Sequence, residues 1–171
     1  MRFNLYSVLV GALCFLALDV SANTFYLVRH AEKQPGGADP ALSECGEARA
    51  QALAVYLADV KLEAIYATGY QRTQQTAAEV AQNQQLKVSF YDPHDTDTLL
   101  RQLASHLQPV LIVGHSNTVP PLVAELSGIE VAALDEQNYS MLYKVELNAE
   151  NPSVTLIRQA FNCNAIKESQ Q

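Results

Sequence analysis

The stretch TFYLVRHAEKQPGG, residues 24–37, joins a buried-strand pattern directly to charged side chains. Residues 25–28 are all apolar, as expected of a short strand inside a sheet. Arg29 and His30 follow at once, and the sequence PGG at 35–37 then predicts a loop. Ligands of open α/β sheets bind beyond the carboxyl ends of the strands. The pair therefore indicates a binding or catalytic site where the strand ends.

Strand-like and helix-like segments alternate along the rest of the chain. This alternation predicts an α/β fold with a mostly parallel central sheet and helices on both faces. Ser43 is expected to cap the first helix, and Gly128 to end the last one. Apolar spacing predicts helical faces within 50–57, 73–81, 99–107 and 119–126, and strands at 24–29, 63–67, 86–90, 109–113, 139–147 and 153–158.

The first 22 residues are typical of a signal peptide. Arg2 supplies a positive start, residues 5–18 are mostly apolar, and small residues at 20–22 precede an expected cleavage site. The apolar run is short for a membrane span, although an uncleaved N-terminal anchor is the alternative. We therefore expect a signal peptide at 1–22, one domain at 23–171, a periplasmic or secreted protein, and no membrane span once the leader is cleaved.

The overall charge excludes some partners. A formal net charge of −7 argues against nucleic acid and anionic membrane surfaces, because both require a basic face. It does not argue against a small anionic substrate, which responds to the local field of a pocket. Beyond the leader, Cys45 and Cys163 either pair or stay as two free thiols, and an exported protein permits the pair.

Three predicted strand ends deliver cationic or imidazole side chains to one edge of the sheet. They are Arg29 with His30, the segment 67–72 with Arg72 at a helix start, and the segment GHSN at 114–117. Two arginines and two histidines at one edge suit a dianion, since a guanidinium forks two hydrogen bonds onto phosphate oxygens. Helix starts at two of these places add backbone N–H groups.

The motifs LVRHAEK, YATGYQRTQQTA and LIVGHSNT, in this order, resemble those of the histidine phosphatase superfamily, with its phosphoglycerate-mutase-like three-layer sandwich. The similarity runs from about Thr24 to Ser127. One departure is Thr68, where many members have serine, and it keeps the hydroxyl group. The resemblance implies that no metal or other cofactor is needed.

The same resemblance implies roles for individual residues. His30 is expected to attack phosphorus and carry the phosphoryl group, which is later hydrolysed. Arg29 and Arg72 are expected to hold the phosphoryl oxygens, and His115 to donate to them. Asn117 is a candidate assistant, and Lys33 and Glu32 meet either the substrate or each other.

The proton donor for the leaving oxygen is the least defined residue of the site. Many members carry a glutamate after the third strand, but this chain has none between Gln82 and Leu107. The loop FYDPHDTDT offers Asp92 as the first candidate, Asp95 as the second and His94 as a weaker third. Both aspartates have a plain structural alternative, because Asp-Pro favours turns and Asp95 suits a helix cap.

The expected function is hydrolysis of a small phosphomonoester outside the cytoplasm. Mutases of this fold need long cover segments, whereas the loop at 34–42 and the connection at 84–96 are short here. An exposed phosphohistidine favours hydrolysis by water. Two alternatives are a phosphohistidine protein phosphatase and a phosphate-binding module without turnover, while the oligomeric state is left open.

Overall fold

A computed structural model describes residues 23–148 and 151–163 of the chain. The predicted signal peptide at 1–22 and its cleavage site lie outside the described residues. Across these two described ranges, none of the helices combines the length and the apolar character that crossing a membrane requires.

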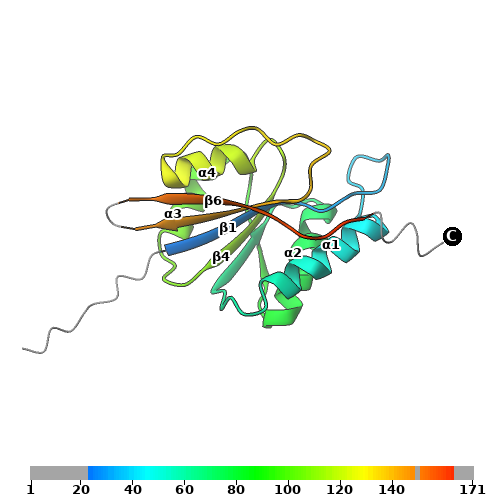
Figure 1. Cartoon of the computed structure of the whole chain (residues 1–171), viewed down its shortest axis with the longest axis horizontal. Coiled ribbons are helices and arrows are strands. Elements are labelled where there is room, and N and C mark those ends of the chain that lie inside the picture. Colours follow the sequence, from blue (N-terminus) through cyan, green and yellow to red (C-terminus); the bar gives the residue numbers. More distant parts are fainter. Residues whose placement is uncertain (1–22, 149–150, 164–171) are drawn as a thin grey trace, which may run out of the picture.

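The described chain forms a six-stranded sheet flanked by four helices (Figure 1). The strands lie in the order β3-β2-β4-β1-β5-β6. The pairs β3–β2, β2–β4 and β4–β1 are parallel, whereas β5 pairs antiparallel with both β1 and β6. This confirms the predicted α/β fold. The elements are β1 (Asn23–Arg29), α1 (Glu44–Tyr56), β2 (Ala64–Ala67), α2 (Gln71–Gln84), β3 (Val88–Phe90), α3 (Thr96–Leu103), β4 (Val110–Gly114), α4 (Val119–Ser127), β5 (Met141–Leu147) and β6 (Ser153–Arg158).

Two hydrophobic layers lie on opposite faces of the sheet. Successive side chains of β1 alternate between them: Tyr26 and Val28 pack with α1 and α2, while Phe25 and Leu27 pack with α3 and α4. The strand period of two residues causes this division, because neighbouring side chains point to opposite faces. The result is a three-layer sandwich with a separate core on each side of the sheet.

The parallel pairing aligns the strand ends that were predicted to form the site. Arg29 lies opposite Gly114 in the β1–β4 ladder, and Ala67 lies opposite Val113 in the β2–β4 ladder. His30 extends the first ladder by one bond, because its N–H donates to the Gly114 carbonyl at 2.9 Å. The side chains that follow β1, β2 and β4 therefore emerge at one edge of the sheet.

The third helix is shorter than its apolar spacing predicted. It ends at Leu103, and Leu107 is 71 % exposed instead of continuing the buried face. The Glu63 carboxylate accepts hydrogen bonds from the N–H groups of Leu107 and Gln108, each at 2.9 Å. These bonds and the following proline fix residues 104–109 as an irregular connection into β4, since a proline disfavours helix in the residue before it.

The first helix begins against the segment that carries the Arg-His pair. Ser43 caps it as predicted, accepting from the Gly46 N–H at 3.2 Å. The Ser43 N–H and hydroxyl both donate to the Glu32 carbonyl, at 2.9 and 3.2 Å. A Cβ atom at Gly46 would lie 2.0 Å from that carbonyl oxygen, so only glycine allows this approach. The backbone just after His30 is thus held by the start of α1.

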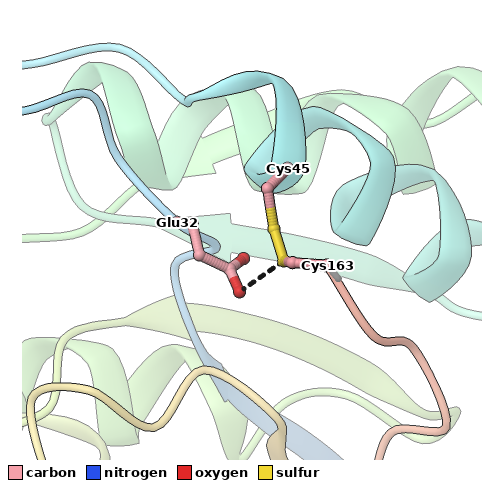
Figure 2. Close-up of side chains that lie close together, drawn as sticks. All are labelled: Glu32, Cys45 and Cys163. Carbon is pink, nitrogen blue, oxygen red and sulfur yellow. Dashed lines mark hydrogen bonds between the residues drawn. A yellow bond between two sulfur atoms is a disulfide. The ribbon is translucent and has the colours of Figure 1, made fainter. Parts of the chain in front are cut away.

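A disulfide joins Cys45 in α1 to Cys163 beyond β6 (Figure 2). Their Cα atoms are 5.5 Å apart, although 118 positions separate the two residues in the sequence. Of the two alternatives left open by the sequence, the structure shows the pair. The sulfur of Cys163 also lies 3.2 Å from Oε1 of Glu32, a packing contact, since a disulfide sulfur carries no hydrogen to donate. The bond ties the segment that follows β6 to the start of α1.

Candidate active site

One cavity of about 460 Å³ collects the residues that follow the three parallel strands. Of the residues predicted for the site, seven line this cavity: Arg29, His30, Lys33, Arg72, His94, His115 and Asn117. The rings of His30 and His115 lie edge to face with their centres 5.3 Å apart. These residues predicted from the sequence are therefore gathered in one cavity at one edge of the sheet.

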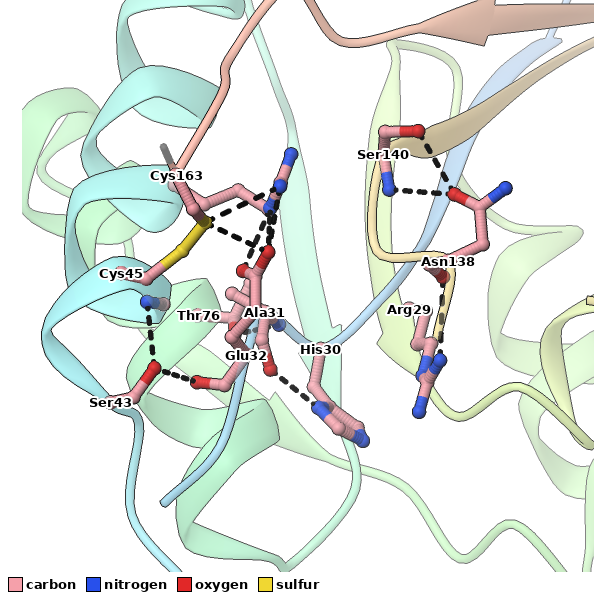
Figure 3. A network of polar contacts seen from close by, with 12 residues as sticks. Arg29, His30, Ala31, Glu32, Ser43, Cys45, Thr76, Asn138, Ser140 and Cys163 are labelled. Atoms are coloured by element: carbon pink, nitrogen blue, oxygen red, sulfur yellow. Dashed lines mark hydrogen bonds and ion pairs between the residues drawn. A yellow bond between two sulfur atoms is a disulfide. The ribbon is translucent and has the colours of Figure 1, made fainter. Parts of the chain in front are cut away.

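His30 is buried at the end of β1 with its ring fixed by the backbone. Its Nδ1 lies 2.7 Å from the Ala31 carbonyl oxygen, which can only accept, so Nδ1 carries the proton and Nε2 keeps a free lone pair (Figure 3). Thr76 Oγ1 accepts from the Ala31 N–H at 3.0 Å and steadies this segment. Burial, reinforced by the charges of Arg29, His115 and Arg72 and opposed by the Ala31 bond, lowers the pKa of His30 to about 3. The ring is therefore neutral and nucleophilic at physiological pH.

Arg29 is anchored by the loop that precedes β5. Its Nη1 donates to the carbonyl oxygens of Glu136 at 2.6 Å, Asp135 at 3.2 Å and Asn138 at 3.3 Å. The Tyr139 ring stacks on the guanidinium, 4.1 Å from its central carbon. All three hydrogen bonds use Nη1 and Nε is buried without a partner, which leaves Nη2 to meet an anion in the cavity.

Arg72 lies in the first turn of α2 and is positioned by two groups. Its guanidinium packs over the Tyr70 ring at 4.3 Å, and Nη1 lies 3.5 Å from the Asp39 carboxylate. Tyr70 occupies the N-cap position of α2, but its side chain makes no capping hydrogen bond. The Asp39 carboxylate takes over this role by accepting from the Gln71 N–H at 2.9 Å. The loop at 34–42 thus caps the helix that carries Arg72.

His115 is held by a short chain of hydroxyl groups. Its Nε2 lies 2.9 Å from Thr68 Oγ1, which lies 2.9 Å from Thr73 Oγ1. The Thr73 hydroxyl donates to the carbonyls of Thr68 and Tyr70, so Thr68 must donate to Thr73 and accept from Nε2–H of His115. Burial, followed by the charges of Arg72 and Arg29, lowers the pKa of His115 to about 4. The ring is neutral, with its proton on Nε2 and its lone pair on Nδ1.

Of the two alternatives for Lys33 and Glu32, the structure does not show the one in which their side chains contact each other. The Glu32 carboxylate forms a forked ion pair with Arg49 of α1, with an N–O distance of 2.7 Å to Nη2. Lys33 lines the cavity with an exposed side chain. Glu32 therefore points toward the disulfide at the start of α1, as Figures 2 and 3 show, and is not among the residues that line the cavity.

The two aspartates predicted as proton donors do not line the cavity. Asp92 accepts from the His94 N–H at 2.9 Å, and Asp95 caps α3 by accepting from the Thr98 N–H at 3.1 Å. Both border a separate hollow beside Phe90 and Leu99. The structural alternatives of a turn and a cap explain their positions, whereas His94, the third candidate, does line the cavity.

Three residues that sequence reasoning missed contribute to the site. Glu136 supplies the single carboxylate among the described residues that line the cavity. Tyr70 lines it too and packs edge to face on His115, with ring centres 5.0 Å apart. Tyr139 covers Arg29 and lies 5.9 Å from the His30 ring. Residues 129–138 have no helical or strand periodicity, and Tyr139 was expected to begin the next strand, so no signal in the sequence pointed to Glu136 or Tyr139 as site residues.

One group of side chains in the described part of the chain has the spacing of a metal site. It consists of Glu32, Cys45 and Cys163, whose ligand atoms lie within 4.8 Å of one another. The two sulfur atoms are bonded to each other and the carboxylate is engaged by Arg49. A metal ligand needs a free thiolate, so this group does not fit a metal in the disulfide form.

A sequence comparison points to the same family as the residues of the cavity. Residues 25–93 match the sequence profile of the histidine phosphatase superfamily (branch 1). This match includes the Arg29-His30 pair and Arg72, and His115 joins them in the cavity. Over these residues the chain is similar to the histidine phosphatase superfamily. No sequence among curated proteins matches the chain.

Solved structures share the fold over nearly their whole length. The protein histidine phosphatase SixA, complexed with tungstate, is 22 % identical, with a TM-score of 0.67 over 83 % of this chain and 99 % of its own. A putative alpha-ribazole-5'-P phosphatase from Escherichia coli is 17 % identical, with a TM-score of 0.65 over 80 % and 96 %. A mycobacterial glucosyl-3-phosphoglycerate phosphatase is 16 % identical, with a TM-score of 0.64 over 82 % and 100 %.

Proposed function

We propose that the protein is a phosphomonoester hydrolase that transfers the phosphoryl group through His30 and acts outside the cytoplasm. The observation that carries this proposal is the fixed tautomer of His30. Its Nδ1–H is bound to the Ala31 carbonyl, which leaves Nε2 as a neutral nucleophile in a cavity shared with two guanidinium groups. The leader-like residues 1–22 support an extracytoplasmic substrate.

In the first step, Nε2 of His30 bonds to phosphorus while the bond between phosphorus and the ester oxygen breaks. His30 keeps its proton on Nδ1, so the phosphorylated ring carries a positive charge that the Ala31 carbonyl stabilises. Arg29 and Arg72 bind the phosphoryl oxygens, where negative charge is spread in a loose transition state. An anionic phosphoryl group also offsets the arginine charges and raises the pKa of His115. His115 then takes a proton from solvent on Nδ1 and donates a hydrogen bond from this N–H to a phosphoryl oxygen.

The leaving oxygen needs a proton, and we assign the role of proton donor to Glu136. This is the single carboxylate among the described residues lining the cavity, and its own carbonyl is bound to Arg29. A protonated Glu136 gives its proton to the departing alcohol. The resulting carboxylate takes a proton from the water that attacks phosphorus in the second step, which releases phosphate and restores both His30 and Glu136.

The test is hydrolysis of p-nitrophenyl phosphate by purified protein, combined with rapid acid-free quenching of the turnover mixture. We expect steady release of phosphate and a phosphorylated protein whose label is stable in alkali and lost in acid, as a phosphoramidate bond is. Phosphate binding without turnover would identify a binding module instead. Turnover without a trapped histidine label would refute the covalent route.

The assignment of Glu136 predicts an effect that depends on the leaving group. Glu136→Gln should lower kcat for an alkyl phosphate such as glycerol 3-phosphate by about 10²-fold or more, which is typical of a lost general acid. The same variant should keep most of its activity on p-nitrophenyl phosphate, whose leaving group scarcely needs a proton. Asp92→Asn and Asp95→Asn are matched controls, and neither should show this split. An unchanged ratio in Glu136→Gln would exclude it as the donor.

A second candidate, dephosphorylation of a phosphohistidine in another protein, has one observation in its favour. Asp92 and Asp95 are both turned to backbone caps, which leaves an exposed glutamate as the carboxylate of the cavity. An imidazole leaving group is less basic than an alkoxide, and its second ring nitrogen can take a proton from water before the bond to phosphorus breaks, so it needs no acid in the cavity. Retention of activity on a phosphohistidine peptide by Glu136→Gln, with no activity on alkyl phosphates in the unmodified protein, would favour this candidate.

A further inference from the structure

A second hollow continues from the phosphate cavity along α4. It measures about 430 Å³ and shares Ser116 and Asn117 with the cavity that holds the two histidines. A ligand bound at its phosphoryl group can therefore extend past these two residues without leaving the hollowed surface. We call this second hollow the α4 groove, lined by Ser116, Asn117, Pro120, Pro121, Ala124, Glu125, Glu130, Val131 and Ala133.

The two hollows have opposite charge. The phosphate cavity is lined by the cations Arg29, Arg72 and Lys33, against the single carboxylate of Glu136. The α4 groove is lined by two carboxylates, Glu125 and Glu130, and by no cationic side chain among the described residues. Both glutamates are exposed and make no ion pair with any described residue, so their charges face the groove uncompensated.

The rest of the groove wall is apolar and rigid. Pro120 and Pro121 occupy the first turn of α4, where proline rings are compatible with the helix. Ala124 from the next turn and Val131 from the chain beyond α4 complete this wall. Such a surface packs against the carbon skeleton of a small molecule, while the two carboxylates accept hydrogen bonds from its hydroxyl or ammonium groups.

We propose that the α4 groove binds the leaving group of the substrate and selects phosphomonoesters whose leaving group bears hydroxyl or ammonium groups and no second anion. This inference rests on the proposed hydrolase function and adds the substrate class to it. A second phosphate or a carboxylate on the leaving group meets Glu125 and Glu130 and is repelled. The charge of the leaving group thus decides which phosphomonoesters are turned over, while the arginines bind the phosphoryl group that all of them share.

The experiment compares two substrates that share a three-carbon skeleton. Glycerol 3-phosphate ends in a hydroxymethyl group, whereas 3-phosphoglycerate ends in a carboxylate. We expect the protein to favour glycerol 3-phosphate in kcat/KM by about two- to fivefold, the range of an exposed charge contact. The charge reversals Glu125→Lys and Glu130→Lys should each shift this ratio toward 3-phosphoglycerate, and their combination should shift it further.

The matched control is Asp59→Lys, which makes the same charge change at an exposed residue just beyond the C-terminal end of α1. This variant should leave the kcat/KM ratio of the two substrates unchanged. A shift as large as that of the Glu125 and Glu130 variants would assign the effect to net charge and refute the proposed role of the groove. Thermal unfolding of each variant checks that the fold is retained.

Two further outcomes separate the inference from the function on which it rests. One outcome is hydrolysis of p-nitrophenyl phosphate together with a kcat/KM ratio of the two substrates that neither glutamate substitution changes. This outcome would overturn the proposed role of the α4 groove and leave the proposed hydrolase function standing. The leaving group would then extend elsewhere, for example toward Lys33. The absence of hydrolysis with every phosphomonoester would overturn the proposed function itself.

Discussion

His30→Ala is expected to reduce kcat for p-nitrophenyl phosphate by at least about 10³-fold, because the variant lacks the atom that bonds to phosphorus. Binding of inorganic phosphate should persist, since Arg29, Arg72 and His115 hold the oxygens independently of the nucleophile. Steady-state kinetics measures the first effect, and isothermal titration calorimetry with inorganic phosphate measures the second. The acid-labile phosphoryl label should also be absent from this variant.

His106→Ala is a suitable control for removal of a histidine. His106 lies outside the cavity, where its ring nitrogens contact the Glu63 carboxylate at 2.8 Å and the Tyr66 hydroxyl at 3.0 Å. Its loss should change stability more than kcat. If His30→Ala kept wild-type turnover, or if His106→Ala lost turnover to the same extent, the assignment of the nucleophile would fail.

Removal of the Cys45–Cys163 disulfide should lower the free energy of unfolding by roughly 4–5 kcal/mol, the chain-entropy value for a closed loop of more than a hundred residues. The separation of 118 positions makes this one of the larger entropic effects that a single bond can have in a chain of this size. The double variant Cys45→Ala with Cys163→Ala, followed by urea unfolding, provides the measurement.

The unmodified protein under a strong thiol reductant should match the double variant in air. The double variant itself should not respond to the reductant, which controls for effects of the reagent. Equal unfolding free energies for the oxidised and the reduced unmodified protein would show that the bond does not restrain the unfolded chain.

The edge of the sheet at which the candidate site residues gather could be predicted from the sequence, because parallel pairing brings the carboxyl ends of the strands to the same edge. The apolar runs at 25–28 and 110–113 identified two central strands, and their parallel pairing places His30 and His115 at the same edge. Arg72 follows β2 by one short turn and reaches the same edge. In each case the position along the chain determines the position in space, because the strand leaves little freedom for the residue that follows it.

The proton-donor candidates and the residues that were missed depend on the direction of side chains within irregular segments, which the sequence pattern does not predict. Asp92 lies at the expected edge, but the turn before Pro93 directs its carboxylate to the His94 N–H. Glu136 belongs to a connection without periodicity, and the three carbonyl contacts with Arg29 that fix this connection join residues more than a hundred positions apart. Local pattern carries no information about such contacts. The signal peptide at 1–22 and the periplasmic or secreted location stay predictions.

The disulfide also sets an order of events during synthesis. Cys45 emerges from the ribosome 118 residues before its partner, which at about 5–20 residues per second means a delay of roughly 6–24 s. During that interval every strand and helix of the sandwich becomes available, while the Cys45 thiol waits unpaired beside Glu32. The disulfide can therefore form only after every strand of the sheet has been synthesised. A nascent chain that stalls before Cys163 contains all the residues of the catalytic cavity but lacks the disulfide.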